Sequence, residues 1–309
     1  MHNPWLDEHP VEYGDFIIET DIPERAASLA EYLGTESAFN YVFYRGHLKD
    51  AEKYGYVHAD SPLRPHSMPI AASNLLLPIA WPLFLQGSPN YVFIPTSVSR
   101  VAAGAPEDAR TNKKVAILDS GSIWPWHPVA SGAEITASSF VGDAPLDAMG
   151  HGSWNMSAAY LGEAETRFGL VRGVAHASQV YSASVLSPFL TGRISHAMKA
   201  LKEAVGWGAK VVLIPLGSEQ QGPVETDPFC RVISQLPDDV VVVASVGNSG
   251  RAWSVESPAV CPRVIGVGAY SITDGAESYF SSRGPSGAWY ETHQDVWHAD
   301  LEKYGPSLK

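Results

Sequence analysis

Three polar residues end apolar or glycine-flanked stretches of this chain, and their side chains could together move a proton and stabilise a developing negative charge. Asp119 ends the apolar run 115–118, His151 lies between two glycines, and Asn248 lies in a turn after the run 240–244. Each residue alone is typical of an ordinary turn. In combination, a carboxylate orients an imidazole, the imidazole acts as a general base, and an amide donates to an oxyanion. The three residue types therefore indicate a catalytic site if the fold brings them together.

The elements that must position these residues form a regular pattern in the second part of the chain. Near-continuous aliphatic runs, typical of strands covered on both faces of a parallel sheet, occur at 115–118, 211–214, 240–244 and 264–268. Residues 191–209 carry an apolar stripe at helical spacing that Gly206 and Gly208 are expected to end, and a second helix is predicted over 157–161. Alternating strands and helices predict an α/β fold with a doubly wound parallel sheet, in which sites form at the carboxyl ends of strands.

The N-terminal part of the chain follows a different pattern. Strands are predicted at 15–20, 40–44 and 90–94, and a helix at 22–33. Small and polar residues at 102–112 are typical of a linker. We therefore divide the chain into an N-terminal α+β region, residues 1–110, and a second domain, residues 111–309.

Composition excludes several classes of protein. The chain has 309 residues, with 21 Lys and Arg against 33 Asp and Glu, and its net charge of −12 excludes binding to a phosphate backbone. The longest apolar stretch, 74–85, is too short to span a bilayer, and the first residues lack a signal-peptide pattern. Two cysteines, Cys230 and Cys261, exclude a disulfide scaffold and a Cys-rich zinc site, and such sparing use fits a reducing compartment. We therefore expect a cytoplasmic protein without nucleic-acid or membrane partners.

The sequence around the three polar residues resembles the subtilase family, the subtilisin-like serine proteases, from about residue 113 to 286. Seven segments match in family order: 116–121, 150–153, 171–177, 214–218, 244–250, 257–269 and 280–285. The first two hold Asp119 and His151, and the fifth holds Asn248. The resemblance implies a parallel sheet of the subtilisin-like type and hydrolysis of peptide bonds through a seryl ester.

The resemblance also implies a role for each matched residue. Asp119 would orient His151, His151 would take the proton of the serine, and Asn248 would donate to the oxyanion. Leu216 and Gly217 would lie along the backbone of a polypeptide substrate, and Gly247 is a further substrate-binding candidate. Calcium supports many relatives, so the resemblance allows a calcium ion, but no loop of this sequence qualifies as its site; from the residues themselves no cofactor or metal is expected.

Two of the departures from the family pattern have consequences for the site. Pro215 lacks an N–H, which removes one possible donor from the strand that pairs with substrate. After Pro285 the family continues to Gly-Thr-Ser-Met-Ala, whose serine is the nucleophile, and residues 286–309 contain no such motif.

Three explanations of the missing motif stay open. In the first, the serine is relocated upstream, with Ser67 as the candidate and Ser37 as a weaker one. In the second, a partner chain supplies the serine helix, or that helix is lost. In the third, the chain is an inactive pseudoprotease that binds peptides or regulates. Residues 1–110 are accordingly either propeptide-like, and then inhibitory, or an integral part of the catalytic domain. A relocated serine would make this region essential for catalysis.

Overall fold

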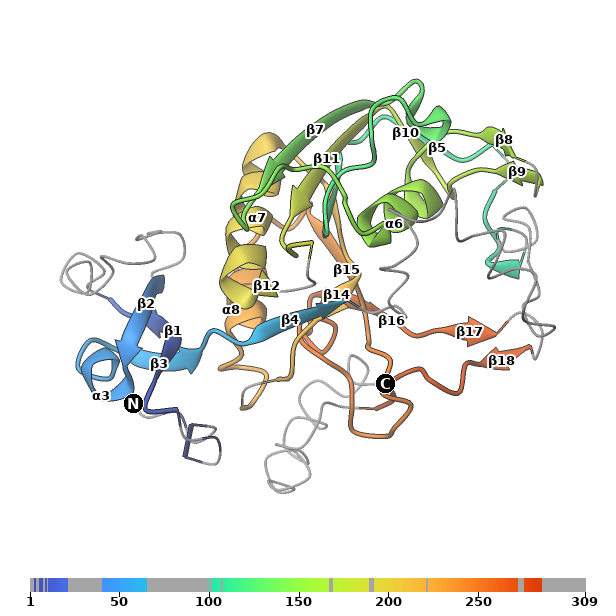
Figure 1. The fold of residues 1–309 in the computed structure, drawn as a ribbon. Coiled ribbons are helices and arrows are strands. Elements are labelled where there is room, and N and C mark those ends of the chain that lie inside the picture. The colour runs from blue at the N-terminus through green and yellow to red at the C-terminus, as the bar shows by residue number, and fades with distance from the viewer. Residues whose placement is uncertain are drawn as a thin grey trace.

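A six-stranded parallel sheet forms the centre of the protein. The computed structural model describes residues 3, 6–7, 9, 11–21, 41–65, 100, 102–106, 108–166, 169–188, 192–220, 222–271 and 275–284 (Figure 1). The strands of the sheet, in spatial order, are β16 (Val264–Val267), β15 (Val241–Ser245), β13 (Val211–Ile214), β6 (Val115–Asp119), β11 (Gln179–Ser184) and β7 (Glu134–Ser139). All neighbouring strands run parallel. The α/β fold class and the four aliphatic strands are therefore confirmed.

Two strands of this sheet, β7 and β11, were not predicted from the sequence. Their sequences are Glu-Ile-Thr-Ala-Ser-Ser and Gln-Val-Tyr-Ser-Ala-Ser, in which hydroxyl side chains interrupt the apolar residues. Ser182 and Ser184 of β11 are nevertheless buried. The aliphatic pattern is thus sufficient to find a buried strand but is not required for one.

Helices cover both faces of the sheet, as a doubly wound arrangement requires. Ala116 and Leu118 of β6 belong to one apolar cluster, which also contains the buried face of α7 (Ile194–Trp207) and of α8 (Pro228–Ser234). Val115 and Ile117 belong to a second cluster, which contains Met156 of α6 (His151–Ala159). Successive residues of β6 thus face opposite cores, as the period of a strand dictates.

The helix boundaries refine the sequence prediction. Helix α7 lies inside the predicted range 191–209 and is capped by Gly208, whose φ is 105°, whereas Gly206 lies within the helix. Helix α6 begins at His151, so the predicted helix at 157–161 covers only its last turn. His151 is therefore the first residue of a helix rather than part of a loop before one.

The N-terminal region contains a separate three-stranded antiparallel sheet. Its order is β2 (Tyr41–His47), β1 (Tyr13–Glu19) and β3 (Tyr56–Ala59), with the short helix α3 (Leu48–Ala51) following β2. The strands predicted at 15–20 and 40–44 are confirmed as β1 and β2. The helix predicted at 22–33 and the strand predicted at 90–94 lie outside the described residues.

The strand after this sheet pairs with the second part of the chain. Strand β4 (Pro62–Pro65) lies between β12 (Gly192–Arg193) and β14 (Leu216–Gly217), antiparallel to both. In Figure 1 it runs from the N-terminal sheet toward the edge of the central one. The N-terminal region is thus joined to the rest of the protein by main-chain hydrogen bonding.

Short pairings complete the described structure. They are β5 (Arg110–Thr111) with β10 (His176–Ala177), β8 (Ala164–Thr166) with β9 (Gly169–Val171), and β17 (Tyr270–Ser271) with β18 (Ala276–Glu277). A 3₁₀ turn spans Pro128–Ala130. Strand β5 lies within the predicted linker 102–112, so the end of that segment is part of the fold.

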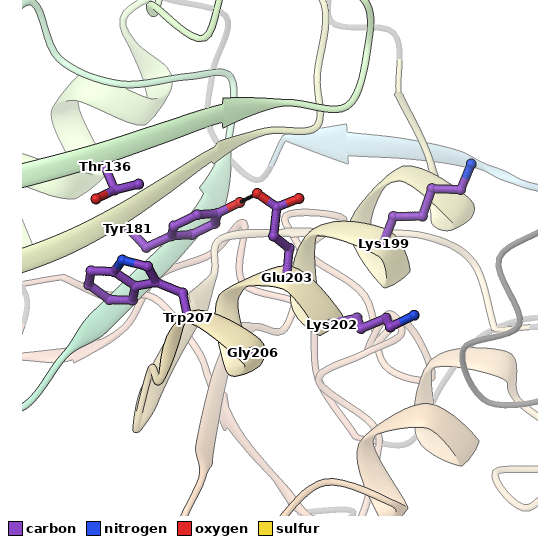
Figure 2. Close-up of a pocket in the computed structure, with 7 residues that line it drawn as sticks. All are labelled: Thr136, Tyr181, Lys199, Lys202, Glu203, Gly206 and Trp207. Atoms are coloured by element: carbon purple, nitrogen blue, oxygen red, sulfur yellow. Dashed lines mark hydrogen bonds between the residues drawn. The ribbon is translucent and has the colours of Figure 1, made fainter.

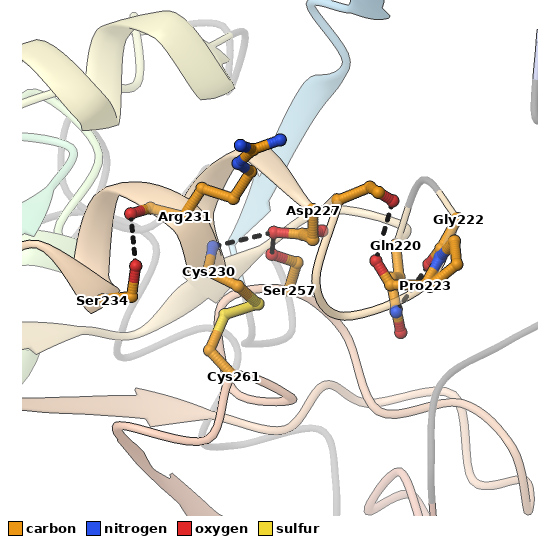
Figure 3. The surroundings of a disulfide bond; sticks show 10 residues. Gln220, Gly222, Pro223, Asp227, Cys230, Arg231, Ser234, Ser257 and Cys261 are labelled. Atoms are coloured by element: carbon orange, nitrogen blue, oxygen red, sulfur yellow. Dashed lines mark hydrogen bonds between the residues drawn. A yellow bond between two sulfur atoms is a disulfide. The ribbon is translucent and has the colours of Figure 1, made fainter. Parts of the chain in front are cut away.

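The two cysteines form a disulfide, which the sequence analysis did not predict. Cys230 of α8 is bonded to Cys261, which precedes β16 (Figure 3). Disulfides are rare in reducing compartments, so this bond removes the cysteine argument for a cytoplasmic location. Among the helices of the described residues, none has the length and apolar character that crossing a membrane needs.

Candidate active site

Asp119 is held at the carboxyl end of β6. All five residues of this strand are buried, and Asp119 itself has no exposed surface. Its carbonyl oxygen accepts from the backbone N–H of Val185, and its Oδ1 accepts from the N–H of Ser120 at 2.6 Å. The carboxylate is therefore fixed at the edge of the sheet at which sites of such folds form.

His151 reaches this edge because the start of α6 packs directly on the turn after β6. Gly150 precedes the helix in the left-handed conformation, with φ of 92°. A Cβ at Gly152 would lie 2.3 Å from the carbonyl oxygen of Gly121. The glycine after His151 is therefore required for the close approach of the helix and the turn.

The expected adjacency of Asp119 and His151 is present. Nδ1 of His151 lies 2.5 Å from Oδ1 of Asp119, and both side chains are buried. Burial by itself lowers the pKa of His151, but the charge and the hydrogen bond of Asp119, with a smaller effect of Asp147, raise it, and the net pKa lies above its ordinary value. The pair has the geometry in which a carboxylate orients an imidazole.

Asp147 organises the start of α6 and was not found from the sequence. This buried carboxylate accepts from the backbone N–H groups of Met149, Gly150 and Ser153 and from the hydroxyl of Ser120, at 2.7 to 2.9 Å. Such donors are the unpaired N–H groups of a helix N-terminus. It lies three residues before the N-cap, Gly150, so its position in the sequence is not that of a capping residue.

Asn155 is a second residue that the sequence analysis missed. It lies one helical turn after His151, and its Nδ2 lies 3.1 Å from Oδ2 of Asp119. The same nitrogen lies 3.3 and 3.4 Å from the two ring nitrogens of His151. Asn155 therefore contacts both members of the pair.

The turn that contains Asn248 follows β15 at the same edge of the sheet. Strand β13 lies between β15 and β6, so the ends of β15 and β6 are about 10 Å apart at the usual strand spacing. Gly247 has φ of 107°, and its carbonyl accepts from the N–H of Ser282. The side chain of Asn248 is exposed, and within the described residues it makes no hydrogen bond to His151. The turn shares the edge with His151, and the role of Asn248 stays a prediction.

Leu216 and Gly217 form the strand β14 and are buried. Leu216 pairs with Pro65 and Gly217 pairs with Arg64 of β4. The sequence analysis expected these two residues to pair with an extended substrate, and the structure pairs them with a strand of the N-terminal region.

Polar contacts hold the N-terminal region beside this strand. Asp60 is buried and accepts from both the backbone N–H and the hydroxyl of Ser195, in the first turn of α7. Arg193 forms an ion pair with Asp15, and Arg231 forms one with Glu19. Burial raises the pKa of Asp60 to about 6, because the donors of Ser195 only partly offset its desolvation.

The proposed nucleophiles, Ser67 and Ser37, lie outside the described residues. Within the described part of the chain, the cluster of possible metal ligands is Asp227 with Cys230 and Cys261. The disulfide accounts for both sulfur atoms, and Asp227 accepts from Cys230 N–H and from the hydroxyl of Ser257 (Figure 3). This cluster is therefore a helix cap beside a disulfide rather than a metal site.

A cavity of about 480 Å³ lies away from this edge, between α7 and the strands β7 and β11 (Figure 2). Tyr181 donates to Glu203 at 2.6 Å across it. Lys199 and Lys202 also line the cavity, but Figure 2 shows their amines directed away from this pair. Its polar groups therefore do not converge on one point.

Comparison with known proteins identifies the family of the chain. The profile described as the subtilase family matches residues 110–296. Subtilisin from Bacillus pumilus is 29% identical over 61% of this chain and 69% of its own length, and subtilisin E from Bacillus subtilis is 28% identical over 61% and 50%. The epidermin leader peptide processing serine protease from Staphylococcus aureus has a similar fold, with a TM-score of 0.62 at 15% identity over 96% of this chain and 81% of that one. That coverage extends the likeness of fold into the N-terminal region. The family profile matches more than half of the sequence, and the chain therefore belongs to the subtilase family.

Proposed function

We propose that this chain is a serine peptidase that hydrolyses peptide bonds by acyl transfer. The observation that carries the proposal is the buried contact between Asp119 and His151 at the carboxyl edge of the sheet. A buried imidazole with a carboxylate on Nδ1 keeps its Nε2 available to take a proton, which is the arrangement of a general base.

Each residue of the edge has a role in this mechanism. Asp119 orients His151 and stabilises the imidazolium that forms when His151 takes the serine proton. The serine oxygen attacks the carbonyl carbon of the scissile bond, and the amide of Asn248 donates to the oxyanion of the tetrahedral intermediate. The C–N bond then breaks, the amine leaves with the proton from His151, and water hydrolyses the remaining seryl ester. Gly247, whose φ of 107° shapes this turn, contacts the substrate through its backbone, and Leu216 and Gly217 hydrogen-bond the substrate backbone.

The substrate is a polypeptide bound in extended form between β12 and β14. The antiparallel pairing of β4 with both strands supports this proposal, because an extended chain already satisfies the main-chain groups there. In the same proposal the N-terminal region, residues 1–110, covers the groove of the catalytic domain, residues 111–309. If another chain supplies the serine, this region acts as an inhibitory segment while β4 is in place; a nucleophile at Ser67 instead makes the region essential for catalysis.

The nucleophile of the proposed reaction is Ser67 or a serine from another chain. Ser67 opens a Ser-Met sequence that runs into small and apolar residues. A fluorophosphonate probe tests this choice, because it labels only a serine that a neighbouring base activates. We expect the purified chain to be labelled, and we expect both Ser67→Ala and His151→Ala to abolish labelling, with Ser157→Ala as the control that leaves it intact.

Other outcomes of this labelling assign the nucleophile elsewhere. Labelling that survives Ser67→Ala but not His151→Ala identifies another serine of the chain, Ser37 among them. Labelling that appears only after a second polypeptide is added identifies a partner that supplies the serine.

A peptide-binding module without catalysis is the second candidate function. The pairing of β4 favours it, because holding an extended chain between β12 and β14 requires no nucleophile. A folded chain that is never labelled, yet whose Leu63→Asp variant binds a synthetic peptide of residues 60–65, would favour this function over hydrolysis. Leu63 is chosen because it is the buried side chain of β4 itself.

A further inference from the structure

The second oxygen of Asp119 has a dedicated side-chain donor. Oδ1 accepts from His151 Nδ1 and from the N–H of Ser120. Oδ2 accepts from Nδ2 of Asn155 at 3.1 Å. Since Asp119 has no exposed surface, water does not replace this donor, and an unpaired oxygen of a buried carboxylate is costly.

The helix fixes the orientation of this donor. Asn155 lies four residues after His151, so the two side chains emerge on the same face of α6. Nδ2 of Asn155 also donates to the backbone oxygen of His151 at 3.0 Å. Both partners, a carboxylate and a carbonyl, only accept hydrogen bonds, so the amide presents its NH₂ end to the pair.

We propose that Asn155 is a positioning residue whose amide donates to Oδ2 of Asp119 and thereby fixes the carboxylate that orients His151. The inference deepens the proposed function, because it concerns the same Asp–His pair. In this proposal Asn155 acts on the reaction only through Asp119 and His151.

The contacts predict the direction in which loss of Asn155 acts on His151. The charged groups that face the ring are Asp119 from β6 and Asp147 from the segment before α6. The amide donor draws negative charge from Asp119, and its NH₂ lies within 3.4 Å of the ring nitrogens, where it disfavours a second proton on the ring. Removing the donor therefore raises the pKa of His151 through both effects.

The test is an NMR titration of the His151 ring in the full chain, with the signal assigned by its loss in His151→Gln. We expect Asn155→Leu and Asn155→Ala each to raise the pKa of His151 by about 0.5 to 1. Leu fills the space of the amide and Ala leaves it empty, so equal shifts report the lost donor rather than lost packing. Ser157→Ala removes a hydroxyl that donates to Ser153 on the same helix and should leave the pKa of His151 unchanged.

Three outcomes overturn the inference: an unchanged pKa in folded Asn155→Leu, a shift in Asn155→Ala alone, or an equal shift in Ser157→Ala. The titration needs no turnover, so it gives its answer even if the chain proves not to cleave peptides. If the chain does cleave them, Asn155→Leu should lower kcat with KM changed less than about twofold, and should move the acidic limb of the pH profile upward with the His151 pKa.

Discussion

At the scale of the residue, the environment of His151 combines opposing effects. Burial disfavours the charged imidazolium, while Asp119 and Asp147 favour it, and the carboxylates outweigh burial. A general base must be neutral to accept a proton. The pKa of His151 is higher than that of a free imidazole, so the neutral base form predominates only at pH values above this raised pKa.

Replacing Asp119 with asparagine removes the charge and keeps the shape. The pKa of His151 should then fall, and the acidic limb of kcat/KM should move to lower pH, although turnover drops by roughly 10³–10⁴-fold because the imidazole is no longer held in the right tautomer. The pH profile of peptide hydrolysis measures both effects. An acidic limb that stays in place would remove His151 from the rate-determining proton transfer.

The sequence was sufficient for some of these residues and not for others. Asp119 and His151 could be predicted from their combination with Asn248 and from the resemblance of their segments to the subtilase family, since each residue alone is typical of an ordinary turn. Asp147 and Asn155 could not, because the contacts of both depend on where α6 starts. Asp147 accepts from backbone N–H groups around that start, and Asn155 lies one turn after His151 on the same face. The position of one helix boundary therefore determined whether two residues of the site could be predicted.

At the scale of the element, the site depends on how closely the start of α6 approaches the end of β6. The carbonyl oxygen of Gly121 blocks the position that a Cβ at residue 152 would need. Any side chain at position 152 must push the helix away from the turn, and His151 moves with it.

Gly152→Ala should therefore separate His151 from Asp119 and lower the free energy of unfolding by roughly 2 kcal/mol or more. The matched control is Gly206→Ala in α7, where a Cβ meets nothing within 4 Å. This control should stabilise the protein by about 0.5 to 1 kcal/mol, since alanine is the better helix former. Chemical denaturation measures both variants. Equal effects would contradict the close approach.

The pairing of β4 is one part of the fold that the sequence could not predict. Pro62 and Pro65 lack N–H donors and are typical of segments outside sheets. The partners of β4 lie more than 120 residues away in the sequence, and no local pattern encodes a pairing between such distant segments. Four strands of the parallel core, in contrast, are marked by their own apolar runs.

At the scale of the whole molecule, the N-terminal sheet is docked through charged groups, and Asp60 makes this docking dependent on pH. Its pKa of about 6 lies above the ordinary value of 3.8, because desolvation outweighs the donors of Ser195 and the charge of Arg193. A raised carboxyl pKa means that the folded protein binds the proton more tightly than the unfolded chain does. The contribution of Asp60 to stability is thus fully present below about pH 4 and is lost as the pH rises through about 6.

Asp60→Asn keeps an acceptor for Ser195 and cannot ionise. The unfolding free energy of the wild type minus that of Asp60→Asn should fall by on the order of 2–3 kcal/mol from pH 4 to pH 7. Thermal or denaturant unfolding of both proteins across this range measures the difference, and all other titrating groups cancel in it. A difference that is constant with pH, or that grows in favour of the wild type, would contradict the raised pKa.

Strand β4 is covalently continuous with the N-terminal sheet, so it occupies its place between β12 and β14 as a tethered ligand. A tether of this kind corresponds to an effective concentration on the order of millimolar. In the proposed mode of substrate binding, a free peptide at micromolar concentration therefore meets a groove that is open only for the small fraction of time in which β4 has left it. Its apparent affinity is reduced by that same fraction, whatever the intrinsic strength of the groove. Cutting or loosening the connection between β3 and β4 therefore changes the apparent affinity for a peptide without altering a single residue that the peptide touches.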